Sequence, residues 1–205
     1  ENLVAYVPGK PMEEVQAEYG LDVVIKMASN ENPLGVSPKA VEAIQKEAVN
    51  CFMYPEGSSR KLREKIAAGF DIADSQVIVG NGADHILTML AEAFVNEGDE
   101  CLMGDPSFAA YNTNTLIMGG TPIKVGLKDM TFDLDAMAAK FSDKTKMIYI
   151  CNPNNPTGTI VGKEAIAAFL AKVPEQAIVV FDEAYAEFVS DPAYPQIIDY
   201  IKAGK

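Results

Sequence analysis

The chain has 205 residues, 48% of them hydrophobic and 22% charged, which is typical of a globular protein with one core or a large domain with an appendage. Its net charge of −12 argues against a nucleic-acid partner, because affinity for phosphate backbones depends on clustered Lys and Arg. No apolar run is long enough to cross a bilayer, so we expect no membrane partner. The three cysteines lack CxxC spacing and His85 is the only histidine, so we expect reduced thiols in a cytoplasmic protein and no metal site.

The N-terminal part of the chain predicts a short strand and two helices. Residues 1–36 are punctuated by Pro and Gly, with the strand expected at Val23–Ala28. Ser37-Pro38 predicts the start of the first helix, with a side-chain cap from Ser37 and Pro38 at the first helical position. A loop around Tyr54 then leads to the second helix, which Ser58 or Ser59 would cap.

From Gln76 onward, short apolar runs alternate with helical patterns. This alternation predicts an α/β fold with a mostly parallel sheet that is covered on both faces. The expected strands are Val77–Val79, Cys101–Met103, Ile123–Val125, Met147–Cys151 and Ala177–Phe181. The expected helices are Asp84–Val95, Leu134–Phe141 and Lys163–Val173.

Polar or turn-forming segments follow most of these expected strands. In open parallel sheets, ligands bind beyond the carboxyl ends of the strands, so a parallel sheet would bring these segments to one edge. The segments are Gly80–Asp84, Gly104–Tyr111, Asn152–Gly158 and Asp182–Tyr185.

Each segment has one interpretation with a ligand and one without. Gly80–Asp84 could bind an anion at a helix N-terminus, or be an ordinary tight turn. Phe108 could stack on a planar ring, or cover a loop. Asn152–Gly158 could hydrogen-bond a ligand oxygen through its amides, or be a rigid connection. Asp182 could pair with a protonated pyridine nitrogen, or cap a helix through Ala186.

Taken together, the sequence resembles the fold-type-I pyridoxal-phosphate (PLP) aminotransferases. Asn155-Pro156-Thr157-Gly158 followed by Asp182-Glu183-Ala184-Tyr185 is the motif pair that carries this resemblance. Further motifs narrow it to the histidinol-phosphate aminotransferase group, and they are Tyr6-x-Pro-Gly, Asn30–Gly35, Tyr54-Pro55 and Gly80–Asp84. The resemblance covers essentially the whole chain.

The resemblance implies a domain plan and an incomplete sheet. Residues 1–30 would be an N-terminal arm and part of the small domain, and residues 31–205 an incomplete PLP-binding large domain. Five of the seven strands of the family's mixed sheet would be present. The first, Val77–Val79, pairs in that family with an antiparallel strand that would follow residue 205.

The resemblance also assigns cofactor-binding roles. Asp182 would pair with the ring nitrogen of PLP, while Tyr185 and Asn155 would hydrogen-bond the ring 3-hydroxyl oxygen. Asp182 and Tyr185 are therefore the expected catalytic residues. Phe108 would stack on the ring. The turn that would receive the cofactor phosphate consists of Gly82, Ala83 and Asp84.

Other implied roles concern the partner subunit and the substrate. Tyr54 would reach the cofactor phosphate of the neighbouring subunit, which implies a homodimer with shared active sites. Tyr6 and Asn32 would lie near the substrate. The family's Schiff-base lysine lies in a Ser-x-Ser-Lys-type segment, and no such segment occurs here. We therefore expect a fragment of a longer protein, and we expect residues 1–205 alone to be inactive.

The implied activity is transfer of an amino group to a 2-oxo acid. Histidinol phosphate and 2-oxoglutarate are the first choice of substrates, which would place the protein in histidine biosynthesis. Aromatic amino acids are the second choice, and a PLP decarboxylase of the same fold is the third. The non-enzyme alternative is an inactive module that keeps the cofactor-binding site.

Overall fold

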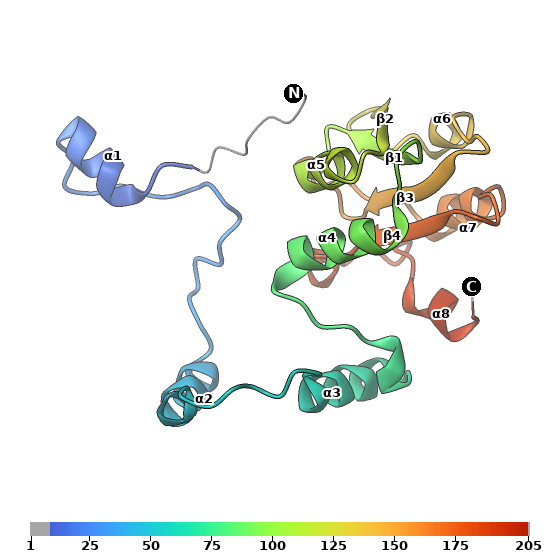
Figure 1. Cartoon of the computed structure of the whole chain (residues 1–205). Coiled ribbons are helices and arrows are strands. Elements are labelled where there is room, and N and C mark those ends of the chain that lie inside the picture. Colours follow the sequence, from blue (N-terminus) through green and yellow to red (C-terminus); the bar gives the residue numbers. More distant parts are fainter. Residues whose placement is uncertain (1–8, 205) are drawn as a thin grey trace. The chain divides into compact units, whose positions relative to one another are not determined.

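The computed structural model describes residues 9–204, which fall into two compact units (Figure 1). Among the described residues, one unit consists of residues 9–59 and the other of residues 60–204. Each is described separately below. The family-based division into residues 1–30 and 31–205 stays a prediction.

The unit of residues 9–59 contains helices α1 (Met12–Tyr19) and α2 (Pro38–Glu47) and a short 3-10 helix, η1 (Ala48–Asn50). Pro38 is the first residue of α2, as predicted, but Ser37 makes no side-chain hydrogen bond to the helix, so the predicted cap is wrong. The predicted strand at residues 23–28 is also wrong, because this segment has no regular structure. A strand requires a hydrogen-bonded neighbour, and the described part of this unit contains no other strand.

The unit of residues 60–204 is built on a sheet of four parallel strands in the order β2-β1-β3-β4. The strands are β1 (Glu100–Asp105), β2 (Thr121–Gly126), β3 (Thr145–Cys151) and β4 (Ile178–Asp182). The two central strands, β1 and β3, are mostly buried, whereas the two outer strands are only partly buried. This arrangement confirms the predicted α/β fold with a parallel sheet.

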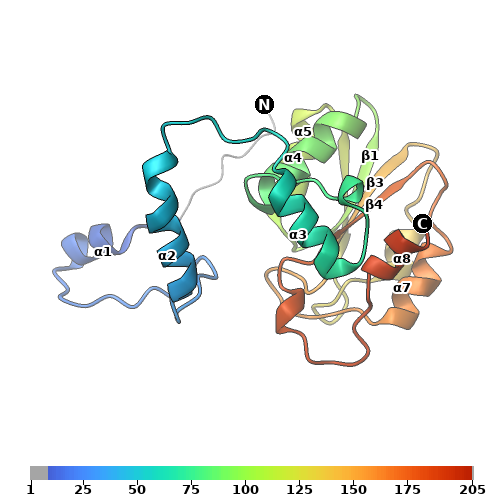
Figure 2. The same cartoon turned by 90° about the horizontal axis from the view of Figure 1, so that it is seen from below.

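Helices connect and cover the strands of this sheet. They are α3 (Arg60–Phe70), α4 (Gly82–Phe94), α5 (Ala109–Ile117), α6 (Leu134–Ala138), α7 (Lys163–Leu170) and α8 (Ile198–Lys202), with 3-10 turns η2 (Asp74–Gln76) and η3 (Ala186–Phe188). Helix α4 packs against α5 and α6 against α7, and Figures 1 and 2 show these pairs on opposite faces of the sheet. Within residues 9–204, none of the helices has the length and apolar composition needed to span a membrane.

Val77–Val79 does not form the predicted fifth strand. The segment has no regular structure, and the side chain of Ile78 is 70% exposed. An extended segment joins a sheet only when a neighbour satisfies its backbone N–H and C=O groups, and the structure gives this segment no such neighbour within residues 9–204. The described sheet therefore has four strands, all parallel, where five of a mixed sheet were expected.

The core lies between the sheet and its covering helices. Its largest fully buried side chains are Tyr111, Tyr149, Phe169, Leu102, Met137, Met147, Ile148, Ile150 and Ile166. Tyr111 of α5 stacks on Tyr149 of β3, with ring centroids 4.6 Å apart and planes at 10°. This stack fixes α5 against the central strand, and thereby holds the loop before α5 at the carboxyl end of the sheet.

Candidate functional site

Hydrogen bonds join the segments that follow β1, β3 and β4. The backbone N–H of Asn152, just after β3, donates to the carbonyl oxygen of Asp182 at 3.0 Å. Ser107 Oγ, in the loop after β1, donates to Oδ1 of Asn154 at 2.9 Å. The hydroxyl of Tyr111 donates to Oδ2 of Asp182 at 2.7 Å. The sheet therefore gathers three of the four predicted segments at one edge.

The carboxylate of Asp182 is half-buried and receives two uncharged donors. Oδ2 accepts from Tyr111, and Oδ1 accepts from the backbone N–H of Ala184 at 3.1 Å. The helical turn η3 begins after Tyr185 and has no side-chain cap, so the alternative of Asp182 as a helix cap is wrong. No Lys, Arg or His within residues 9–204 forms an ion pair with Asp182. A carboxylate accepts about four hydrogen bonds, so the two that Asp182 accepts leave it capacity to bind a further N–H group.

Tyr111 donates to this carboxylate as a neutral phenol. Burial raises the pKa of its hydroxyl well above the usual range, and the neighbouring Cys151 and Asp182 raise it further. The hydroxyl therefore keeps its proton at all physiological pH values. It orients the Asp182 side chain without introducing a positive charge beside it.

The three asparagines after β3 have different environments. The side chain of Asn152 is buried and makes two hydrogen bonds to the backbone of Val161, at 3.1 and 2.9 Å. Asn154 is also buried and donates to the carbonyl oxygen of Pro106 at 3.2 Å. The side chain of Asn155 is half-buried and makes no hydrogen bond to the residues that the structure describes. Asn155 is therefore the amide of this loop that is available to a ligand.

Two aromatic residues also lie in these segments. Phe108 is half-buried immediately before α5, and its ring meets Tyr111 edge-on, with centroids 5.7 Å apart and planes at 84°. Tyr185 is half-buried and immediately precedes η3. The two predicted aromatic contributors thus lie beyond the ends of β1 and β4.

A further contact ties the C-terminal segment to this edge. The hydroxyl of Tyr194 lies 2.9 Å from Oε1 of Glu183 and 2.5 Å from the carbonyl oxygen of Asn152. Burial raises the pKa of Glu183, an effect that the hydrogen bond from Tyr194 partly offsets. Glu183 thus accepts a hydrogen bond from Tyr194, whereas the adjacent Asp182 accepts one from Tyr111.

The turn at Gly80–Asp84 contains two glycines in different environments. A Cβ at Gly80 would lie 2.9 Å from the side chain of Ile86, and Gly82 has a φ of 76° that favours glycine. Ala83 and Asp84 are exposed, and their backbone N–H groups make no hydrogen bond to the described backbone. Such amides at the start of a 13-residue helix are suited to an anion. Helix α4 packs on α5, but no hydrogen bond in residues 9–204 joins the turn directly to Asp182.

The remaining predicted site residues belong to the N-terminal part of the chain. Tyr54 is fully exposed within the unit of residues 9–59. Asn32 lies in the same unit and accepts the N–H of Leu34 at 3.0 Å within its own turn. Tyr6 lies outside the described residues. The roles of these three residues stay predictions.

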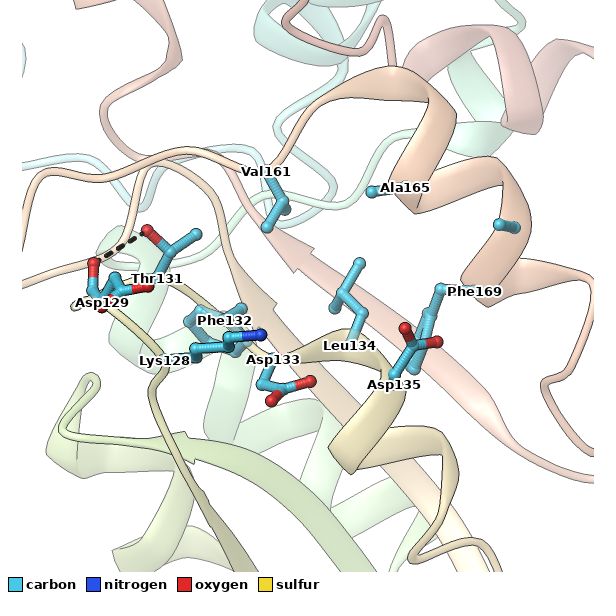
Figure 3. Close-up of a pocket in the computed structure, with 11 residues that line it drawn as sticks. Lys128, Asp129, Thr131, Phe132, Asp133, Leu134, Asp135, Val161, Ala165 and Phe169 are labelled. Carbon is cyan, nitrogen blue, oxygen red and sulfur yellow. Dashed lines mark hydrogen bonds between the residues drawn. The ribbon is translucent and has the colours of Figure 1, made fainter.

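A separate pocket of about 400 Å³ lies between α7 and the segment that leads into α6 (Figure 3). Two of its carboxylates already have partners, since Asp133 caps α6 through the N–H of Ala136 at 2.9 Å and Asp135 pairs with Lys172 at 2.7 Å. None of the predicted site residues lines it. No group of three or more His, Cys, Asp or Glu side chains within residues 9–204 is arranged to bind a metal ion.

A parallel α/β sheet with a carboxylate, an amide and aromatic rings beyond its carboxyl edge is the arrangement of the class of α/β proteins that bind ligands at the end of the sheet. The family follows from sequence comparison. The sequence profile of the family described as aminotransferase class I and II matches residues 22–204. The chain therefore belongs to this family.

Individual relatives are consistent with this assignment. The chain is 49% identical over 200 residues to the histidinol-phosphate aminotransferase of Moorella thermoacetica, covering 98% of this chain and 52% of that protein. The crystal structure of the Clostridium acetobutylicum histidinol-phosphate aminotransferase matches with a TM-score of 0.74 and 29% identity, over 86% of this chain and 51% of that one. The aromatic aminotransferase of Pyrococcus horikoshii matches with a TM-score of 0.69 and 28% identity, over 80% and 48%. The chain spans about half the length of the curated relatives it matches.

Proposed function

We propose that the full-length protein is a PLP-dependent aminotransferase that transfers the amino group of histidinol phosphate to 2-oxoglutarate, as a step of histidine biosynthesis in the cytoplasm. The observation that carries the proposal is the half-buried carboxylate of Asp182, which has two neutral donors and no cation among the described residues. A protonated pyridine nitrogen supplies the missing positive charge. The 49% identity to the Moorella thermoacetica enzyme supports the choice of substrate.

The donor groups at the sheet edge suit the chemistry of PLP. Asp182 would hold the ring nitrogen in its protonated form, and bound PLP would then withdraw electrons from the substrate Cα. The side-chain amide of Asn155 makes no hydrogen bond to the described residues, whereas its backbone N–H donates to Cys151 Sγ. This side-chain amide would bind the ring 3-oxygen together with Tyr185. Phe108 would cover the ring face. The turn of Gly82, Ala83 and Asp84 would bind the phosphate through the N–H groups of Ala83 and Asp84, because the N–H of Gly82 already donates to the carbonyl oxygen of Gly80 at 3.0 Å.

Aromatic amino acids are the alternative substrates, and the match to the Pyrococcus horikoshii aromatic aminotransferase supports that alternative. A PLP decarboxylase of the same fold and an inactive cofactor-binding module are the remaining alternatives. All four hypotheses use the same residues at the carboxyl edge of the sheet. They differ in the product that the full-length protein forms.

The experiment that tests the proposal is a turnover assay on the full-length protein with PLP. We expect glutamate to form from 2-oxoglutarate when histidinol phosphate is the donor, with a higher kcat/KM than for tyrosine or phenylalanine. A higher kcat/KM for the aromatic donors would support the alternative substrates. Release of carbon dioxide from an amino-acid substrate would indicate a decarboxylase. Bound PLP without any turnover would indicate the inactive module.

We also propose that the active enzyme is a homodimer in which Tyr54 binds the cofactor phosphate of the partner subunit. The resemblance motivates this assignment, and the full exposure of Tyr54 within its own unit is compatible with it. Co-expression of Tyr54→Ala and Asp182→Ala subunits then places both native side chains in one of the two sites of each mixed dimer. With random pairing, about a quarter of the wild-type activity should return.

Tagging the two variants separately and purifying the doubly tagged dimer would isolate the mixed species. Each homodimeric variant serves as the control, and both should be far less active than the mixture. If Tyr54 acts on the cofactor of its own subunit, the mixed dimer will have no intact site and no activity will return.

A further inference from the structure

Tyr111 contacts Asp182 from the interior of the protein. Its hydroxyl is the one side-chain donor to that carboxylate within residues 9–204, at 2.7 Å from Oδ2. The motif-based assignment gives Tyr111 no role, although the residue ends the predicted segment Gly104–Tyr111 and lies in helix α5.

The position of the Tyr111 ring is tightly constrained. The residue is fully buried, with its ring stacked on Tyr149 at 4.6 Å and met edge-on by Phe108 at 5.7 Å. Close-packed interiors leave such a side chain no alternative rotamer. Its hydroxyl is therefore a fixed donor, and the carboxylate must adapt to it.

Two fixed donors on different oxygens define the plane of the Asp182 carboxylate. Tyr111 bonds Oδ2, and the backbone N–H of Ala184 bonds Oδ1. Each oxygen keeps further acceptor capacity. Without the phenol, a half-buried carboxylate would be free to rotate about its χ2 torsion and turn toward water, because that torsion is broad.

We propose that Tyr111 is a positioning residue that holds the Asp182 carboxylate in the orientation required by a protonated heteroaromatic ring nitrogen. The inference rests on the proposed function, since it takes the pyridine ring of PLP as the group that Asp182 binds. The edge-on contact with Phe108 gives Tyr111 a second effect. One ring then orients both the carboxylate and the aromatic side chain that would cover the cofactor.

The test compares two ligands of the full-length apoprotein that differ at one ring atom. One is PLP, and the other is its carbocyclic analogue, in which a CH group replaces the ring nitrogen. Both carry the same aldehyde and phosphate, so the ratio of their Kd values, measured by equilibrium dialysis, isolates the contribution of the ring nitrogen. In the wild type the analogue should bind about tenfold or more weakly, because a hydrogen bond to a charged group is lost.

Tyr111→Phe removes the donor and keeps the aromatic stack. We expect the Kd ratio to fall by about three- to tenfold, the range for one lost hydrogen bond. The matched control is Tyr149→Phe, because the buried hydroxyl of Tyr149 has no hydrogen-bond partner among the described residues. This control removes the same atom from the other ring of the stack, and it should keep the wild-type ratio.

The outcomes separate this inference from the proposed function. A wild-type ratio near one would show that Asp182 does not pair with a ring nitrogen, which overturns the proposed function as well. A high wild-type ratio that survives in Tyr111→Phe would overturn the positioning role alone. An equal fall of the Kd ratio in Tyr149→Phe would also overturn the positioning role, because a change in packing, and not the lost hydrogen bond, would then explain the fall.

A second replacement keeps the test decisive if Tyr111→Phe does not fold, which near-ultraviolet circular dichroism would reveal. 4-Aminophenylalanine at position 111 has nearly the shape of tyrosine but is a weaker donor. The Kd ratio should then fall between the wild-type value and one. An unchanged ratio in this folded variant would contradict the positioning role.

Discussion

Replacement of Asp182 by Ala or Asn in the full-length protein is expected to lower kcat for amino transfer by several orders of magnitude. The physical reason is electronic, since a ring nitrogen without a carboxylate partner loses its proton and withdraws electrons poorly from the substrate Cα. The measurement is glutamate formation under saturating PLP, so that a weaker affinity for the cofactor does not account for the loss.

The two variants of Asp182 differ in their expected stability, which separates a catalytic effect from a structural one. Asn keeps an oxygen that can accept from the Tyr111 hydroxyl, whereas Ala leaves this buried hydroxyl without its acceptor. The unpaired hydroxyl should lower the free energy of unfolding by about 1–3 kcal/mol in the Ala variant. We therefore expect both variants to be inactive, and Asp182→Ala to melt at a lower temperature than Asp182→Asn.

Asp105→Asn offers a matched control, because Asp105 ends strand β1 of the same sheet but is exposed. It should keep most of the activity. Near wild-type turnover in Asp182→Ala would refute the pairing with the ring nitrogen.

The local sequence was sufficient to predict the parts of this site that depend on backbone conformation and on where the strands end. The carboxylate of Asp182 follows an uninterrupted apolar run, and the glycine-dependent turn at Gly80–Asp84 precedes a helix, so both features are visible as short patterns. The predicted parallel sheet followed from the alternation of such runs with helical patterns. Each of these elements can be predicted from its own residues, without knowledge of its tertiary contacts.

The wrong strand predictions have a common cause. Val77–Val79 and Val23–Ala28 have the composition of strands, but a strand forms only when a second segment supplies hydrogen-bond partners. Composition reports the preference of a segment and carries no information about its neighbour. Neither segment has a neighbouring strand in residues 9–204, and both are irregular there.

Local sequence patterns also could not predict the roles of individual polar residues. The sequence places three amides after β3, and only the tertiary contacts show that Asn152 and Asn154 bind the backbone while Asn155 does not. Helix α5 was not predicted, because Asn112–Thr115 interrupts its apolar spacing. Without this helix, nothing indicated that Tyr111 faces Asp182, a residue 71 positions further along the chain.

A polypeptide of residues 1–205 expressed alone is expected to be inactive and either insoluble or molten. Strand β4 is an outer strand and is only partly buried, although its sequence is almost entirely apolar. The side chain of Ile78 is 70% exposed, and helix α2 contains no buried residue although Ile44 lies on it. Each large apolar side chain left in water forgoes about 1.5–3 kcal/mol of stabilisation, and an uncovered apolar strand edge promotes aggregation.

The full-length protein is the control for this last prediction, and it should melt cooperatively under the same conditions. Ile78→Lys in the 205-residue polypeptide should increase its soluble yield, because a charge at an exposed apolar segment opposes strand-to-strand association. Thermal unfolding followed by circular dichroism and the dispersion of amide NMR signals are the measurements. A sharp cooperative transition together with well-dispersed amide signals from residues 1–205 would show that the four-stranded sheet with its covering helices is stable without further partners.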